Sequence, residues 1–388
     1  MNSKKLFVAE SATCGQPDKL CDLIVETILD RVLEDDRFAR VDLDAMAAPG
    51  LLLVAGQLTT KAYLNIQGLV RDVVDGIGYN TCATNFEATS IAILTMIGEQ
   101  SPEIHVVVDN KGAGNQGMGV GYATDEGRAV GVDLDFMPLP QWLAHRLTAA
   151  LDRLRLDGKL PHLYADGTSQ IVVQYDEGVP TRLRSAVLSA HHRSDAALED
   201  VRRALRELVL DPILGDFPEQ LTSGAEVLAN PAGPFTVGGP AADIGLSGRK
   251  GVSDAYGTAC AFGGSSPVGK DPTKTDRASV CMARYLAKNL VAAGIARRAE
   301  IRLVYLLGRR DPLSVQVDTF GTSSVDEPAI AQALAQLVDL STPGMVEHLQ
   351  LRKVRYAPTA CGGTYGRPEL DLPWERLDLV DALRSALG

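Results

Sequence analysis

The stretch over residues 238–277 constrains this chain most, because it combines nine glycines with paired cations and four acids in one weakly hydrophobic tract. Its charged side chains include Arg249, Lys250, Lys270, Lys274, Asp243, Asp254, Asp271 and Asp276. Glycine lets backbone N–H groups approach an anion closely, Lys and Arg neutralise phosphates, and Asp holds the accompanying Mg²⁺. The tract therefore favours a polyphosphate site over its alternative, a long surface loop rich in turn formers. Neither G-x-x-x-x-G-K-[ST] nor a strand-linked G-x-G-x-x-G is present, so the scaffold is a different one.

The motifs within this tract resemble one enzyme family. The sequence GGPAADIGLSGRK followed by GKDPTKTDR resembles the S-adenosylmethionine synthetases, also called methionine adenosyltransferases. Three other stretches agree in order and spacing: ESATCGQPDK from Glu10, GAGNQGMGVGYATDE from Gly112 and ARYLAKNLVAAGIA from Ala283. The resemblance extends from Leu6 to the PWE sequence at Pro373, which is nearly the whole chain.

Bulk properties exclude several classes of protein. A formal net charge of −11 argues against a general nucleic-acid binder, so the cations of the tract form a local site in an acidic protein. The six cysteines form no C-x-x-C pair, which argues against a zinc site and predicts reduced thiols. No apolar stretch reaches the roughly 18 residues that a membrane span needs, and we expect a cytoplasmic protein that binds no membrane.

Periodicity predicts an α+β protein. Residues 6–11 resemble a strand, a helix is expected from Pro17, and two strands are expected on either side of Pro49–Gly50. A further helix is expected over 89–97. The family resemblance implies three similar α/β domains in a pseudo-threefold arrangement, with flat sheets packed across a dimer and active sites at the subunit interface.

The predicted domains span residues 1–104, 112–237 and 238–388, and the predicted assembly is a homodimer or homotetramer. Family members carry a longer mobile loop before the GAG motif. Here only HVVVDNK, residues 105–111, separates that motif from the preceding SPEI sequence. The sequence therefore predicts a shortened active-site lid.

The resemblance assigns the metal ligands. Asp18 and Asp276 match the family's Mg²⁺-binding aspartates, and Asp44 stands where the family has a Glu that helps to bind K⁺. The alternative is that these carboxylates are solvated or cap helices. Mg²⁺ and K⁺ are the cofactors expected on this basis.

The resemblance also assigns the ATP site. Arg249, Lys250 and Lys270 match the triphosphate-binding cations, Phe235 matches the aromatic ring that stacks on adenine, and Asp243 matches an acid near the ribose. The alternatives are a core position for Phe235 and a solvated face for the cations. Further expected ATP contacts are Asp166, Thr168 and Ser266. The expected catalytic residues are Lys270, Arg249, Lys250 and Gln16.

Several positions depart from the family pattern. Gln16 replaces a His, Cys14 a Glu and Thr168 a Lys, while Gln57 and Asn115 replace two acids that hold the ammonium of methionine. The remaining positions expected to face the acceptor are Gln100, Lys274 and Leu307, with Lys274 meeting its carboxylate.

These departures give the functional hypothesis. In the family reaction the sulfur of methionine attacks C5′ of ATP and expels triphosphate, which is then cleaved to diphosphate and phosphate. We expect an ATP-dependent adenosyltransferase of this type whose small-molecule acceptor lacks the α-ammonium or is anionic. The alternatives are an ordinary S-adenosylmethionine synthetase, a catalytically silent regulatory subunit and a tripolyphosphatase.

Overall fold

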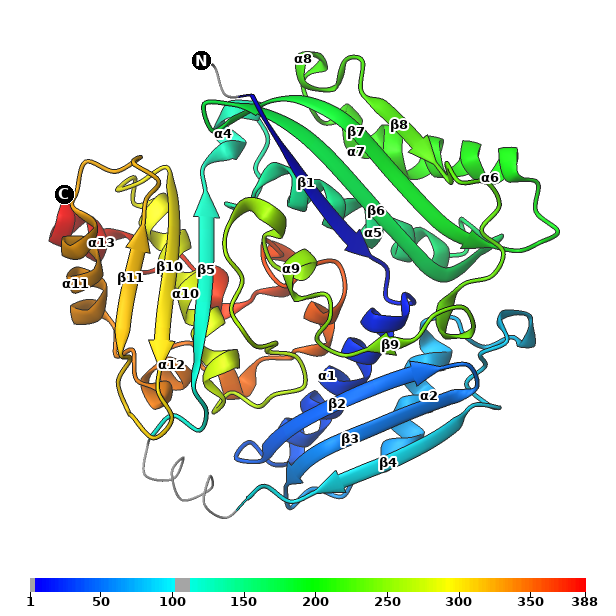
Figure 1. Ribbon diagram of the computed structural model, residues 1–388, viewed down its shortest axis with the longest axis horizontal. Coiled ribbons are helices and arrows are strands. Elements are labelled where there is room, and N and C mark those ends of the chain that lie inside the picture. The colour runs from blue at the N-terminus through cyan, green and yellow to red at the C-terminus, as the bar shows by residue number, and fades with distance from the viewer. Residues whose placement is uncertain (1–3, 102–111) are drawn as a thin grey trace.

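The computed structural model describes residues 4–101 and 112–388, which form three sheets with helices packed against them (Figure 1). The shortened HVVVDNK connection and the predicted domain boundary at 104 lie outside the described residues. The mixture of helices with mainly antiparallel strands is the predicted α+β class. Among the described residues, no helix is both long and apolar enough to cross a membrane.

The first sheet has the strand order β4-β3-β2-β9. Strands β2 (Arg40–Ala48) and β3 (Leu51–Thr59) form the predicted hairpin, and Gly50 takes a φ of 71° in its turn. Helix α1 (Pro17–Asp35) begins at Pro17 as predicted and packs on β2. The remaining elements of this unit are α2 (Ile66–Gly76), β4 (Ala92–Gly98) and β9 (Gly245–Leu246).

The prediction of a helix over 89–97 is wrong, because most of this segment forms β4. It pairs in parallel with β3 over its whole length. Ile93 is buried while Leu94 and Met96 are exposed, which is the period-two alternation of a strand with one covered face. A short apolar run is compatible with either a helix or a strand, and pairing with β3 makes this one a strand.

The second sheet has the order β1-β6-β7-β8 and the third has the order β11-β10-β5. The second sheet contains β1 (Lys5–Ala12), β6 (Leu163–Asp176), β7 (Val179–His192) and β8 (Glu226–Ala229), with α5 (Leu139–Leu156), α6 (Leu198–Leu205), α7 (Asp211–Gly215) and α8 (Glu219–Thr222) nearby in the chain. The third contains β5 (Gly117–Thr124), β10 (Arg298–Tyr305) and β11 (Ser314–Asp318). The other helices are α4 (Glu126–Val130), α9 (Gly251–Asp254), α10 (Thr275–Ala292), α11 (Glu327–Leu337), α12 (Thr342–His348) and α13 (Val380–Leu387).

Each sheet takes a strand from another part of the chain. The N-terminal β1 pairs with β6, the tract's β9 pairs with β2, and β5 pairs with β10. The three predicted domains thus share strands with one another, and the positions of their boundaries stay a prediction. This exchange brings the glycine tract between the sheets, where Figure 1 shows α9 and β9 near the centre of the molecule.

Helix α10 is almost completely buried and lies directly on β5. Gly119 and Gly121 permit this contact, because a Cβ on either would lie 2.2 Å from the Ser279 hydroxyl or 2.0 Å from the Ala283 backbone. The glycines of the GAGNQGMGVGYATDE motif thus have a packing role. Gly117 of the same motif lies beside the first turn of α10, where a Cβ would be 2.6 Å from the Asp276 carboxylate.

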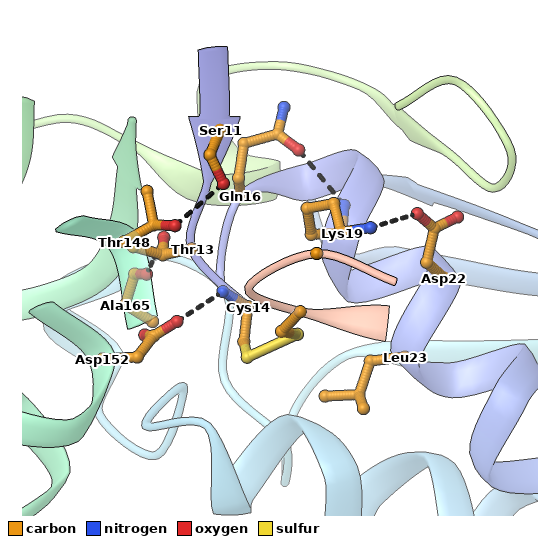
Figure 2. The surroundings of a disulfide bond; sticks show 12 residues. Ser11, Thr13, Cys14, Gln16, Lys19, Asp22, Leu23, Thr148, Asp152 and Ala165 are labelled. Atoms are coloured by element: carbon orange, nitrogen blue, oxygen red, sulfur yellow. Dashed lines mark hydrogen bonds and ion pairs between the residues drawn. A yellow bond between two sulfur atoms is a disulfide. The ribbon is translucent and has the colours of Figure 1, made fainter. Parts of the chain in front are cut away.

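The prediction of reduced thiols is wrong for Cys14 and Cys361, which form a disulfide across a separation of 347 residues. Cys14 precedes Gln16 and Lys19 at the start of α1, and Figure 2 shows the hydrogen bond from its N–H to Asp152. The donor and acceptor atoms are 2.8 Å apart. The disulfide joins this loop to the TACGGTYGR segment. Sequence separation alone could not have indicated that these two cysteines meet.

Thiol labelling of the native protein without reductant should leave Cys14 and Cys361 unmodified and linked. Cys82 is exposed and should react first, whereas Cys21 and Cys281 are buried. Burial raises the pKa of the Cys281 thiol to about 12, so it should react only after denaturation. Peptide mass spectrometry with and without reduction measures this pattern. Alkylation of both Cys14 and Cys361 before reduction would contradict the disulfide.

Candidate active site

The first group of predicted site residues lies at the start of α1. Gln16 is the N-cap, and its Oε1 accepts from the N–H groups of Asp18 and Lys19 at 2.9 and 3.1 Å. Asp18, only 2% exposed, accepts from Lys250 Nζ at 2.6 Å and from the Leu246 N–H at 2.9 Å. The structure thus places Gln16 as a helix cap beside Asp18.

Arg249 also reaches Asp18, at 3.4 Å, so both cations of the GRK sequence face this carboxylate. Burial opposes ionisation of Asp18, but the hydrogen bonds from Lys250 and the Leu246 N–H outweigh it and lower the pKa of the carboxyl. The side chains of Arg249 and Lys250 remain partly exposed. Both cations therefore lie where they could also contact an anionic ligand bound beside Asp18.

A buried ion cluster supports this end of α1. Lys19 Nζ lies 2.9 Å from Asp22 and 2.6 Å from Asp254 of the tract. Asp22 in turn accepts from the Gly248 N–H at 2.8 Å. Some backbone N–H groups of the glycine tract therefore donate to carboxylates of the protein itself. Asp254 therefore has a structural role through its ion pair with Lys19. Asp271 also has a structural role, because it is fully buried and accepts from the Val41 and Thr273 N–H groups.

The second group lies at the start of α10. The Asn115 amide oxygen accepts from the Thr275 N–H at 2.9 Å, and its Nδ2 donates to the Asp276 carboxylate. Asp276 is 7% exposed, and burial raises the pKa of its carboxyl. The positive charge of Lys270 partly offsets this rise, whereas the negative charge of Asp42 adds to it. Both ends of the Asn115 amide are therefore engaged. A carboxylate at position 115 would repel Asp276.

Asp42 on β2 completes this second group. Its carboxylate lies 3.1 Å from Lys274 Nζ and 3.9 Å from Lys270 Nζ, and its backbone forms an isolated bridge with Lys270. Sequence reasoning missed Asp42. The available signal was the alternation in RVDLDAM, which places Asp42 and Asp44 on the same face of a strand opposite the buried Val41 and Leu43.

A third group surrounds Phe235. Its ring is half-buried and stacks on His191, with centroids 5.3 Å apart. Asp166, on β6, accepts from the Gly239 N–H at 2.8 Å. Thr168 follows on the same strand, where it is exposed, and Asp243 is also exposed. One face of Phe235 is therefore covered by protein.

Burial raises the pKa of Asp166 to about 6, although the Gly239 N–H acts in the opposite direction. The native state therefore holds a proton that the unfolded chain has lost, and this carboxyl makes the protein less stable as pH rises between about 4 and about 6. Asp166→Asn removes this effect while its amide oxygen still accepts from Gly239. Relative to wild type, the variant should gain about 2–3 kcal/mol in free energy of unfolding between those pH values.

Urea denaturation at pH 4 to 7 measures this difference, with the exposed Asp72→Asn as control. A gap between Asp166→Asn and wild type that does not change with pH would show that Asp166 ionises normally.

The other predicted positions are dispersed. Asp44 accepts from the Ser247 hydroxyl at 2.7 Å, and the Ser266 hydroxyl accepts from the Val268 N–H at 3.2 Å. Gln57 is exposed on β3, and Leu307, directly after β10, is 50% exposed. Gln100 is buried, and its N–H donates to the Thr59 hydroxyl at 3.1 Å.

The donor set suits Mg²⁺ only in combination with a ligand. Within residues 4–101 and 112–388, no three His, Cys, Asp or Glu side chains are grouped so that they could hold a metal ion. Mg²⁺ is commonly bound by one or two carboxylates together with substrate phosphates. Asp18 and Asp276 each offer one carboxylate beside cations that can receive phosphate, which fits that mode of binding.

Comparison with known proteins identifies the family. Residues 4–102, 110–235 and 237–376 match the N-terminal, central and C-terminal domains of S-adenosylmethionine synthetase. The S-adenosylmethionine synthases of Desulforudis audaxviator, Sulfurovum sp. and Nocardia farcinica are 42%, 41% and 40% identical to this chain, with 99% or more of both chains covered in each comparison. The chain therefore belongs to the S-adenosylmethionine synthetase family and is an adenosyltransferase with that family's three-domain architecture.

Proposed function

We propose that this protein forms S-adenosylmethionine from ATP and methionine. The observation that carries the proposal is the identity of 40–42% over essentially the whole chain to proteins named S-adenosylmethionine synthase. These comparisons favour the ordinary synthetase over the acceptor without an α-ammonium that the sequence had suggested. The amide at Asn115 is consistent with this choice, because it holds α10 and Asp276 in place and is not left free to select an acceptor.

The proposed chemistry is direct displacement at C5′ of ATP. The methionine sulfur forms a bond to that carbon while the bond to the triphosphate oxygen breaks. Such a step depends on in-line positioning and on stabilising charge on the leaving group more than on a general base. Arg249, Lys250 and Lys270 would receive the triphosphate. Asp18 and Asp276 would hold Mg²⁺, which supplies additional charge neutralisation at the phosphate oxygens.

The remaining ATP contacts follow from the third group. Phe235 would stack on adenine with the ring face that does not contact His191. Asp243, Asp166, Thr168 and Ser266 would make the further ATP contacts. Gln16 would act by holding Asp18 in place. Lys274, Gln57, Gln100 and Leu307 would face methionine, and Asp44 would take part in binding K⁺.

The proposed assembly is a homodimer, or a homotetramer built from it, in the cytoplasm. Leu94 and Met96 project from the first sheet with 53% and 70% of their surface exposed. Apolar side chains on an open sheet face suit a second copy of the same face. Since no three-residue metal group lies within the described part of one chain, a partner subunit bringing a second carboxylate to each phosphate site would complete it.

The test is product analysis with the purified protein, ATP, Mg²⁺ and methionine. We expect S-adenosylmethionine, diphosphate and phosphate in equal amounts by mass spectrometry and phosphate assay. Phosphate release without any 5′-substituted adenosine would instead identify a hydrolase. Absence of both products would identify a silent subunit.

A further inference from the structure

We propose that Asp42 is a specificity-determining residue that receives the ammonium group of the amino-acid acceptor. The inference rests on the proposed function, since it takes a zwitterionic amino acid as the acceptor. The first observation is the Asp42–Lys274 ion pair at 3.1 Å. The Lys274 side chain is 8% exposed and that of Asp42 is 33% exposed, so a buried cation faces a carboxylate that solutes can reach.

This pair matches the head group of an α-amino acid, which carries a carboxylate and an ammonium on one carbon. On binding, the ligand carboxylate replaces Asp42 at Lys274, and the ligand ammonium replaces Lys274 at Asp42. One ion pair is thereby exchanged for two. No net charge is added to a partly buried site, so the desolvation that penalises an unpaired ion is avoided.

The neighbouring strand supplies neutral hydrogen-bond acceptors. Asp42 is directly opposite Gln57 in the antiparallel β2–β3 pairing, so the two side chains share a face with Cβ atoms about 4.5–5.5 Å apart. Thr59 lies two residues further along that face, and its hydroxyl accepts from the Gln100 N–H. Among these hydrogen-bond acceptors, Asp42 is the one that carries a negative charge.

Gln100 offers an independent indication of a missing donor. Its side-chain Oε1 is buried and has no hydrogen-bond partner in the described structure. A buried unpaired acceptor is costly, and such groups often await a ligand. An ammonium brings three N–H donors, enough for Asp42, Gln57 and Gln100.

The charged groups facing Asp42 come from α10 and the segment before it. Lys270 lies 3.9 Å away, and the proximity of Asp42 contributes to the raised pKa of Asp276. Asp42 therefore stands between the proposed phosphate-binding cations and the acceptor. Its removal must be separated experimentally from an effect on ATP.

The test compares Asp42→Asn with wild type, using methionine and its des-amino thioether analogue as acceptors. The KM for methionine should rise by about tenfold or more, because a charge-assisted hydrogen bond is lost. The KM for ATP and the rate of tripolyphosphate hydrolysis should change much less than the KM for methionine, although Asp42 lies near Lys270 and Asp276. The KM for the des-amino analogue should change least, because the analogue has no ammonium group to lose a partner. Asp42→Glu, which restores the carboxylate, should recover part of the methionine affinity. Asp72→Asn, on the exposed face of α2, is the control.

An unchanged methionine KM in Asp42→Asn would overturn the inference. So would a parallel rise in the KM values of methionine and ATP, which would mean that Asp42 only holds Lys270 and Lys274 in place. Should Asp42→Asn fail to fold, Asp42→Glu decides, since it must change the KM for methionine and leave that for ATP. Failure of the proposed function is distinct, because wild type would then form no S-adenosylmethionine.

Discussion

Asp276→Asn is expected to reduce Mg²⁺-dependent adenosyl transfer by at least about a hundredfold. Asp276 is nearly buried, held by Asn115 and close to Lys270, so the protein fixes the position of its carboxylate. An amide offers a hard cation an oxygen but no charge. The same change removes a buried charge, and thermal stability should therefore hold or rise.

Steady-state rates at saturating Mg²⁺ measure the loss, with Asp72→Asn as the matched control for removing an acid. Full activity in Asp276→Asn, or activity of wild type in excess EDTA, would contradict a metal role for this residue.

Lys270→Ala is expected to cost roughly 2–4 kcal/mol of transition-state stabilisation, because the change removes the charge that we propose meets the departing triphosphate. The backbone contact between Lys270 and Asp42 does not involve the side chain and should persist. The fold should therefore survive, and kcat should fall more than affinity for ATP.

The control is Lys61→Ala, which removes an exposed lysine outside all three groups. Turnover by Lys270→Ala at the wild-type rate would show that the cations of the second group do not stabilise the leaving group.

Local sequence patterns predicted much of the fold. Helix α1, its start at Pro17 and the β2–β3 hairpin were all available from periodicity and turn residues. Strand β4 was not, because its short apolar run acquires its conformation from pairing with β3. The exchange of β1, β5 and β9 between sheets likewise depends on long-range contacts that no local pattern carries.

The roles of the candidate site residues stay a prediction, and the sequence motifs named residue types without their pairings. The motifs indicated Asp18 and Lys250, yet only the structure shows them 2.6 Å apart. The amides at Gln57 and Asn115 suggested an acceptor pocket without negative charge. That prediction left out Asp42, because a strand pattern alone cannot show that Asp42 lies opposite Gln57 and pairs with Lys274. The charge balance of a pocket is a property of several distant segments, and single substitutions misrepresent it.

A competition between methionine and its des-amino thioether analogue for the wild-type protein, with ATP and Mg²⁺ saturating, identifies the acceptor most directly. If the acceptor is the methionine zwitterion, kcat/KM for methionine should exceed that for the analogue by about tenfold or more, since each charge-assisted hydrogen bond to the ammonium contributes about 1.5–3 kcal/mol. The adenosyl products are distinguished by mass. Equal or better use of the analogue would contradict methionine as the acceptor and would favour an acceptor without the amine.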